Sequence, residues 1–133
     1  MILVDSNVLF DIVTDNAEWF EWSRTALERA EVQGAIGIND VVFAEFSVRY
    51  PRLEDVEQAV DRLGLSHLPT PRTVLFLAGK AFEAYRRREG ATKTGVLPDL
   101  LIGAHALVLG VPLITRDTRR YRTYFPTVEL ITP

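Results

Sequence analysis

The sequence begins with MILVDSN (residues 1–7), in which four apolar residues are followed directly by Asp5, Ser6 and Asn7. A short apolar run that ends in turn-forming polar residues is typical of a strand buried on both faces of a sheet. Residues 35–38 (AIGI) and 111–115 (VPLIT) repeat this pattern, and residues 128–131 (VELI) predict a fourth strand. The first strand is therefore predicted to end at Asp5.

Helical patterns separate these predicted strands. Asp15 and Glu18 resemble the capping box that begins a helix. Apolar residues then recur at helical spacing over residues 19–30, 53–63 and 74–85. Strands that alternate with helices of this length predict right-handed crossovers, and hence an α/β fold with a mainly parallel sheet covered on both faces.

Composition limits the class of protein. The chain has 133 residues, 47% of them hydrophobic and 25% charged, with no cysteine, which predicts one globular domain over residues 1–133 and excludes disulfides, zinc–cysteine sites and thiol nucleophiles. The first seven residues contain no basic residue, so they do not resemble a signal peptide. The longest nearly apolar run, residues 100–113, is shorter than the roughly 20 residues of a membrane span, and we expect a cytoplasmic protein.

The charges are distributed unevenly along the chain. Residues 1–70 carry 5 basic and 13 acidic side chains, whereas residues 71–124 carry 10 basic and 4 acidic ones. Taken alone, such an asymmetry is more typical of solvated helix faces than of a binding surface. Thirteen of the fifteen basic residues are arginine, whose planar guanidinium binds phosphate with two parallel hydrogen bonds.

Acidic residues follow the predicted strands. Asp5 and Asp117 each come directly after an apolar run, ILVD and LITRD, and so lie at the carboxyl edge of the sheet. Glu45 falls in the early turns of the helix that leaves residues 35–38, and we expect Asp40 to be the N-cap of that helix. Its first turns face the same edge, so these acids are predicted to lie near one another.

Asp99 is predicted to reach this edge by a different route. Pro98 is typical of a first helical position, and the helix over residues 98–109 leads into the strand at 111–115. A helix that precedes a parallel strand runs opposite to it, so Asp99 also begins at the carboxyl edge. Two unit charges 4 Å apart repel by about 4 kcal/mol at an effective dielectric of 20, so four gathered acids need compensation. Either some stay protonated, or a hard cation such as Mg²⁺ or Mn²⁺ binds them, as one ion or two; we favour the cation.

Four segments together resemble one protein family. The segments DSN (5–7), VFAE (42–45), PDLLI (98–102) and LITRD (113–117) are similar to the PIN-domain ribonucleases, and most of all to the VapC toxins. The resemblance spans nearly the whole chain and implies a PIN-like α/β/α sandwich with a central sheet of four to five strands. It implies that the catalytic Mg²⁺ site is made of Asp5, Glu45, Asp99 and Asp117.

The resemblance also implies supporting residues, a reaction and partners. Ser6 or Thr115 would supply a supporting hydroxyl, and Asn7 would assist the first turn. The expected activity is that of a Mg²⁺-dependent endoribonuclease toxin, in which Mn²⁺ can substitute and metal-activated water cleaves structured RNA. The expected partners are a second copy of the chain and a cognate VapB-type antitoxin. The basic residues predicted to bind RNA phosphates are Arg86, Arg87, Lys93, Arg116, Arg119 and Arg120.

Two other functions fit parts of the sequence. A phospho-receiver-like signalling domain has a similar size and an acidic pocket, but it needs a lysine at a strand end, and the two lysines, Lys80 and Lys93, fall in a helix and a loop. A non-catalytic RNA- or protein-binding module would use the arginine-rich half without needing four acids at one edge. The Walker A, HExxH, GxSxG and dinucleotide glycine motifs are absent from the sequence.

Overall fold

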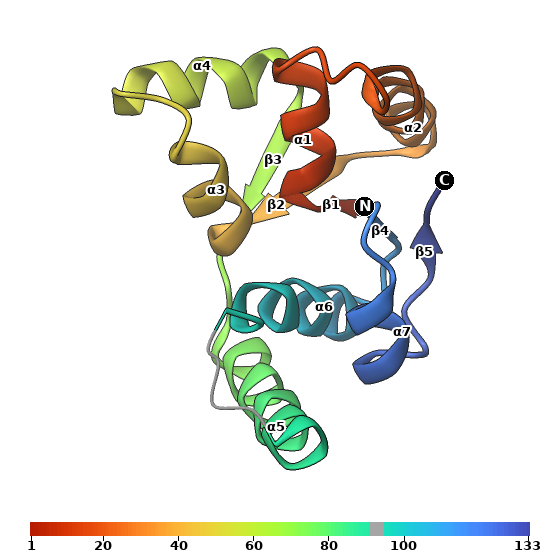
Figure 1. The fold of residues 1–133 in the computed structure, drawn as a ribbon. Helices are drawn as coiled ribbons and strands as arrows, with labels where there is room; N and C mark the ends of the chain where they lie inside the picture. Colours follow the sequence, from red (N-terminus) through yellow and green to blue (C-terminus); the bar gives the residue numbers. More distant parts are fainter. Residues whose placement is uncertain (91–94) are drawn as a thin grey trace.

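The computed structural model of the protein describes residues 1–90 and 95–133, which form an α/β fold (Figure 1). The described part of the chain contains five strands and seven helices. In chain order they are β1 (Ile2–Val4), α1 (Ser6–Val13), α2 (Phe20–Gln33), β2 (Ile36–Asn39), α3 (Asp40–Ser47), α4 (Leu53–Arg62), β3 (Leu65–Leu68), α5 (Arg72–Glu89), α6 (Leu97–Leu109), β4 (Leu113–Ile114), α7 (Arg119–Tyr124) and β5 (Leu130–Ile131).

The five strands form one parallel sheet in the order β3-β2-β1-β4-β5. From β1 the chain proceeds outward to β2 and β3, then crosses to β4 on the other side of β1. The strand order therefore reverses between β1 and β4. Open α/β sheets bind their ligands in the crevice at such a switch point, at the carboxyl ends of the strands. Val4 pairs with Ile114 in the register of these two strands, so the residues that follow them begin side by side.

Helices cover both faces of the sheet, as the sequence predicts. Helices α1 to α4 lie on one face, and α5, α6 and α7 lie on the other (Figure 1). The prediction of a parallel sheet inside an α/β/α sandwich is confirmed. Strand β1 is apolar and fully buried because both of its faces are covered.

Helix α6 passes close to the chain that follows α7. A Cβ atom at Gly103 would come within 2.4 Å of the Phe125 ring, so this position has no room for a side chain. The close approach places the first turn of α6, which carries Asp99, next to α7 and its arginines.

Some local expectations differ from the structure. The N-cap of α3 is Asn39, whose side chain accepts a hydrogen bond from the Val42 N–H at 3.0 Å, and Asp40 is the first helical residue. The N-cap of α2 is Trp19, without a side-chain cap, and in the turn before it Asn16, not Asp15, accepts from the N–H groups of Glu18 and Trp19. At both places the amide oxygen of an Asn, and not the carboxylate of the neighbouring Asp, accepts from the free N–H groups.

Strand β3 and helix α1 are absent from the sequence-based assignment. Strand β3 (LSHL) lies at the edge of the sheet, and three of its four residues are at least partly exposed, so it lacks the apolar run that marks the inner strands. Helix α1 begins directly after Asp5, with no intervening loop. No helix in the described part of the chain is long and apolar enough to cross a membrane.

Candidate functional site

The four acids predicted to form a site lie at the carboxyl edge of the sheet, around the switch point between β1 and β4. Asp5 follows β1 and is only 4% exposed, and Asp117 follows β4 and is exposed. Glu45 in α3 and Asp99 in the first turn of α6 are partly buried. Asp5 and Asp99 both repel Glu45, and Asp99 is also repelled by Asp117, so the structure brings all four charges into one neighbourhood.

Asp5 is held on one side by three donors. Its Oδ2 atom accepts hydrogen bonds from the Thr115 hydroxyl at 2.8 Å, the Tyr121 hydroxyl at 2.9 Å and the Asn7 amide at 3.4 Å. Burial raises the pKa of Asp5, the two hydroxyls oppose this rise, and repulsion by Asp99 adds to it. No side chain in the described residues donates to Oδ1, which leaves this oxygen available to a ligand.

Glu45 is oriented by a residue from another helix. The Ser6 hydroxyl in α1 donates to Glu45 Oε1 at 3.0 Å, which fixes one carboxylate oxygen. Burial raises the pKa of Glu45, while the bond from Ser6 lowers it, and repulsion by Asp5 and Asp99 raises it further. The predicted supporting role of Ser6 thus has a contact in the structure, although this contact is with Glu45 and not with Asp5.

Asp99 forms an ion pair inside the site. Arg120 of α7 donates to Asp99 Oδ2 at 2.8 Å, with 36% of the Arg120 side chain and 24% of the Asp99 side chain exposed. Burial raises the pKa of Asp99, the Arg120 guanidinium opposes this, and Asp117 raises it again. Arg120 therefore compensates part of the acidic charge of the cluster.

Thr115 connects the ends of β1 and β4. Its hydroxyl accepts from the Asp117 N–H at 3.1 Å and from the Asn7 amide at 3.4 Å. Asn7 also accepts from the backbone N–H of Arg116, at 3.4 Å. The residues expected to support the acids, Asn7 and Thr115, thus form a continuous polar bridge beneath Asp5.

Two observations bear on whether a divalent cation fits this cluster. The carboxylate oxygens are the hard donors that Mg²⁺ and Mn²⁺ prefer, and Mg²⁺ is often held by only one or two carboxylates while it keeps several waters. Among the described residues, however, no group of three or more acidic or histidine side chains stands close enough to hold one ion together. The donor chemistry fits, and Arg120, which is bonded to Oδ2 of Asp99, would compete with the cation for this carboxylate.

The predicted phosphate-binding residues have different surroundings. Arg116 makes two hydrogen bonds with Asp11 of α1, Nε to Oδ2 at 2.7 Å and Nη2 to Oδ1 at 2.9 Å, and its guanidinium lies 5.1 Å from the centre of the Trp19 ring. Arg120 pairs with Asp99, whereas Arg119 is exposed.

Two further arginines of this set lie on α5. Arg86 lies over the Phe82 ring, and Arg87 is near Glu83 at 3.4 Å. Both are exposed. Lys93 lies outside the described residues.

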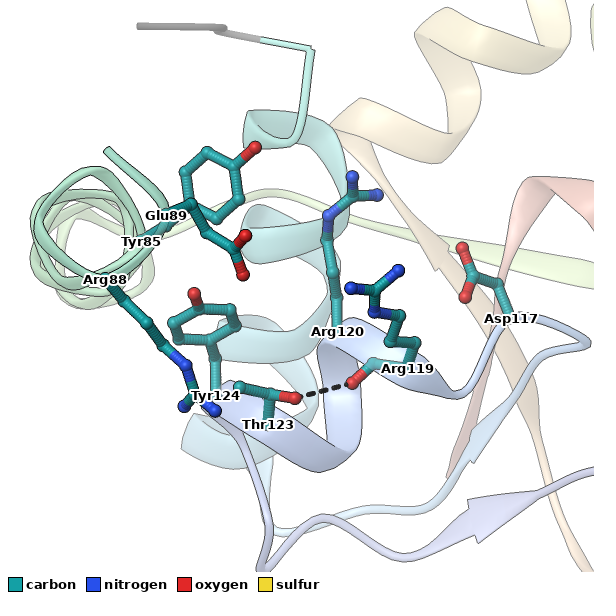
Figure 2. A pocket seen from close by; sticks show the side chains of 8 residues that line it. All are labelled: Tyr85, Arg88, Glu89, Asp117, Arg119, Arg120, Thr123 and Tyr124. Atoms are coloured by element: carbon teal, nitrogen blue, oxygen red, sulfur yellow. Dashed lines mark hydrogen bonds between the residues drawn. The ribbon is translucent and has the colours of Figure 1, made fainter. Parts of the chain in front are cut away.

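A pocket of about 450 Å³ lies between the end of α5 and α7 (Figure 2). Its walls carry Tyr85, Arg88 and Glu89 from α5 and Arg119 and Tyr124 from α7. Asp117 and Arg120 also line it, so the pocket adjoins the acid cluster.

Sequence reasoning missed three kinds of contact residue. Tyr121 follows Asp117 by four residues, and its buried hydroxyl bonds to Asp5, but tyrosine in a short basic helix carries no signal for this role. Asp11 interrupts the apolar residues 8–13 of α1, which could have marked it as the partner of a cation. The pocket tyrosines, Tyr85 of α5 and Tyr124 of α7, are far apart in the sequence and meet only because the two helices lie close together, so no sequence signal marks them.

Comparison with known proteins places this geometry in context. A model of the PIN domain matches residues 2–126 of the chain. No curated protein matches it. Among solved structures, a chain of VapBC2 from Rickettsia felis, bound to a DNA fragment from its promoter, has a TM-score of 0.73 and 19% identity, and the match covers 100% of this chain and 99% of that chain.

Two other solved structures give the same result. A chain of a toxin–antitoxin complex from Klebsiella pneumoniae has a TM-score of 0.68 at 21% identity, with 100% of this chain and 98% of that chain covered. A chain of VapBC-1 from nontypeable Haemophilus influenzae has a TM-score of 0.70 at 18% identity, with 99% and 98% covered. At these identities the likeness shows a shared fold.

Proposed function

Because the chain belongs to the PIN-domain family, we propose that it is a divalent-cation-dependent endoribonuclease, a VapC-like toxin that a cognate antitoxin neutralises. The observation that carries this proposal is the gathering of Asp5, Glu45 and Asp99 from three separate segments at the switch point of the sheet. A structural protein gains nothing from repulsion among partly buried acids, whereas a site that binds a cation and a phosphodiester requires them.

The residues that would hold Mg²⁺ or Mn²⁺ are Asp5, Glu45, Asp99 and Asp117. When bound, such a cation neutralises charge on the phosphate and lowers the pKa of a coordinated water. The roles of the surrounding residues follow from their contacts. Thr115 and Tyr121 fix Oδ2 of Asp5 and so aim its other oxygen, and Ser6 does the same for Glu45.

RNA binding is assigned to the exposed basic residues near the cluster. Arg119, Arg86 and Arg87 are exposed and can reach phosphates. Arg116 is different, because its guanidinium already makes two hydrogen bonds with Asp11 within the protein. We therefore assign Arg116 a role in positioning the end of β4.

Cleavage of RNA by a purified Asp99→Asn variant tests the proposal. We expect the variant to fold and to cleave about 10²- to 10³-fold more slowly than the wild type, because removal of one charged group from a preorganised site has effects of this size. Asp61→Asn, at an exposed position on α4, is the matched control and should cleave like the wild type. A folded Asp99→Asn protein with wild-type activity would favour the non-catalytic binding module instead.

Mapping of the cut ends gives the product chemistry. Hydrolysis by water is expected to leave 5′-phosphate and 3′-hydroxyl ends, whereas attack by the RNA 2′-hydroxyl would leave a cyclic phosphate. Sequencing of both kinds of end after brief expression, beside the Asp99→Asn control, separates the two.

The proposed partners rest on the likeness to solved toxin–antitoxin complexes. We propose that an antitoxin binds this chain and blocks the cluster, and that the chain forms a homodimer. Light scattering on the purified chain should give twice the 15.0 kDa mass, and co-expression with an antitoxin from the same operon should abolish RNA cleavage.

A further inference from the structure

The pocket between α5 and α7 has a composition that the acid cluster does not explain. Two tyrosines form part of its wall, and three arginines border it, against two acids, Glu89 and Asp117 (Figure 2). Its volume of about 450 Å³ lies within the roughly 300–1,000 Å³ that is usual for pockets binding small ligands. A pocket of this size that offers both aromatic rings and arginines suits a nucleotide.

We propose that this pocket is a subsite for one unpaired nucleotide of the RNA, adjacent to the bond that is cut. This inference rests on the proposed nuclease function, whose substrate it narrows to RNA that is single-stranded at the cleavage site. The base would lie against Tyr85 and Tyr124, and the phosphate would bind Arg88 and Arg119.

The tyrosine end of the pocket provides the surface for the base. The rings of Tyr85 and Tyr124 lie 6.2 Å apart at an angle of 64°, and both are partly exposed. The Tyr124 hydroxyl is buried and has no hydrogen-bond partner among the described residues. A base stacked on an aromatic ring gains about 1–3 kcal/mol.

Two arginines of the pocket, Arg88 from α5 and Arg119 from α7, provide the phosphate contacts from opposite sides (Figure 2). Arg88 and Arg119 are both exposed, and neither side chain makes an ion pair or hydrogen bond with the described residues. This distinguishes them from Arg116 and Arg120, whose guanidinium groups pair with Asp11 and with Asp99. Because the described residues do not neutralise Arg88 or Arg119, both guanidinium groups can bind phosphate.

The position of the pocket connects it to the cleavage site. Asp117 lies at one end of the pocket, and Glu89 lies at the other, near Tyr85 (Figure 2). Arg119 lies on the Asp117 side of the pocket, so a phosphate bound by Arg119 would be the one nearer to the acid cluster (Figure 2). A base pair does not fit against the two tyrosines, since stacking there requires a base that has left its helix.

Binding without catalysis tests the subsite. The probe is a fluorescein-labelled single-stranded RNA hexamer, and its anisotropy is followed with the full chain in EDTA, where no divalent cation is present. Arg119→Ala and Arg88→Ala should each weaken binding about tenfold and reduce the salt dependence by about one phosphate contact. Arg122→Ala is the matched control, because Arg122 is an exposed arginine on the same helix that does not line the pocket, and it should bind like the wild type.

Variants of Tyr85 test the stacking. Tyr85→Leu keeps apolar bulk against α6 and should weaken binding about tenfold, whereas Tyr85→Phe keeps the ring and should bind like the wild type. A melting curve for each variant verifies that it is folded. Competition with 5′-mononucleotides, and with the hexamer annealed to its complement, should show that the duplex binds more weakly than the single strand.

The outcomes separate the subsite from the nuclease. If the chain cleaves RNA while the Arg88, Arg119 and Tyr85→Leu variants bind as well as the wild type, the subsite is overturned and the nuclease stands. If these variants lose binding while the wild-type chain cleaves no RNA with any divalent cation, the nuclease is overturned and the pocket remains a nucleotide site. Duplex binding as tight as that of the single strand would also overturn the subsite.

Discussion

Two aspartate–arginine pairs lie on either side of the end of β4, and they differ in almost every physical respect. Asp11 and Arg116 make two hydrogen bonds, and the Asp11 side chain is only 2% exposed. Asp99 and Arg120 make one hydrogen bond, and both side chains are more accessible than Asp11. The two arginines are four residues apart in the sequence, yet they serve different parts of the molecule.

The surroundings of each pair explain the difference. Asp11 also accepts from the Ser23 hydroxyl at 2.6 Å, and Arg116 lies over Trp19, so the first pair ties the end of β4 to α1 and α2. Asp99 instead faces other acids that repel it, and burial raises its pKa. Arg116 bonds to both carboxylate oxygens of Asp11, whereas Arg120 bonds to only one oxygen of Asp99. The same two residue types therefore form a pair with a buried aspartate that joins β4 to α1 at one position, and a more accessible pair among other acids at another.

The largest effect that would sharpen this comparison is on stability. Arg116→Met should lower the free energy of unfolding by about 3 kcal/mol, because it leaves the Asp11 carboxylate buried without its partner. The measurement is urea unfolding of the metal-free protein. Arg24→Met, which removes the exposed pairs with Glu21 and Glu28 on α2, is the control and should change stability far less, because water screens exposed ion pairs. Equal losses in both variants would show that the Asp11 pair is no more structural than a surface pair.

The next effect concerns replacement of Arg120 by a cation. Mn²⁺ at 100 times its Kd should stabilise the wild type by about 2.7 kcal/mol, seen as a rise of several degrees in Tm. Asp99→Asn should lose most of this rise, whereas Arg120→Gln should retain or increase it, because the competitor of the metal has been removed. An equal rise in wild type and Asp99→Asn would mean that the ion binds elsewhere. No rise at saturating Mn²⁺ would favour protonated acids over a bound cation.

A smaller effect is expected at Asp5, which lies between the two pairs. Tyr121→Phe removes one of the hydroxyls that donate to Oδ2, while Thr115 and Asn7 remain. We expect a loss of about 1–2 kcal/mol in stability, since hydrogen bonds to charged groups are worth about 1.5–3 kcal/mol and one of several is lost. RNA cleavage should fall about tenfold, and the Mn²⁺ concentration for half-maximal rate should rise. An unchanged Mn²⁺ requirement would mean that Tyr121 does not position Asp5.

The sequence predicted the layout of the sheet edge better than its contacts. Strands β1, β2 and β4 are apolar on both faces, so their ends, and with them Asp5 and Asp117, could be located from the pattern alone. Asp99 was placed by topology, since a helix that leads into a parallel strand must begin at that strand's carboxyl edge. The family prediction is confirmed by the match over residues 2–126.

The contacts could not be predicted because they depend on how helices are rotated against one another. Arg116 and Arg120 look alike in the sequence, and only the packing of α1, α6 and α7 assigns one to Asp11 and the other to Asp99. Strand β3 was missed for a different reason, because its sequence LSHL has exposed Ser66 and His67 where the predicted strands have apolar residues. The acids of the site can thus be located from local sequence patterns, but which arginine pairs with which acid depends on the tertiary structure.

The smallest expected effect is a pH dependence of the stability, and it concerns Glu45, another acid of the cluster. Burial and the nearby acids raise the pKa of Glu45, so the wild-type fold is favoured while this group is protonated, below about pH 4. That stability is lost as the pH rises through the raised pKa of Glu45. Glu45→Gln stays neutral and keeps the Ser6 bond, so in metal-free buffer its Tm relative to wild type should rise between pH 4 and pH 7. In saturating Mg²⁺ the order should reverse at pH 7, since the charged carboxylate then has a cation to bind, and a difference that does not vary with pH or Mg²⁺ would place Glu45 outside the cluster.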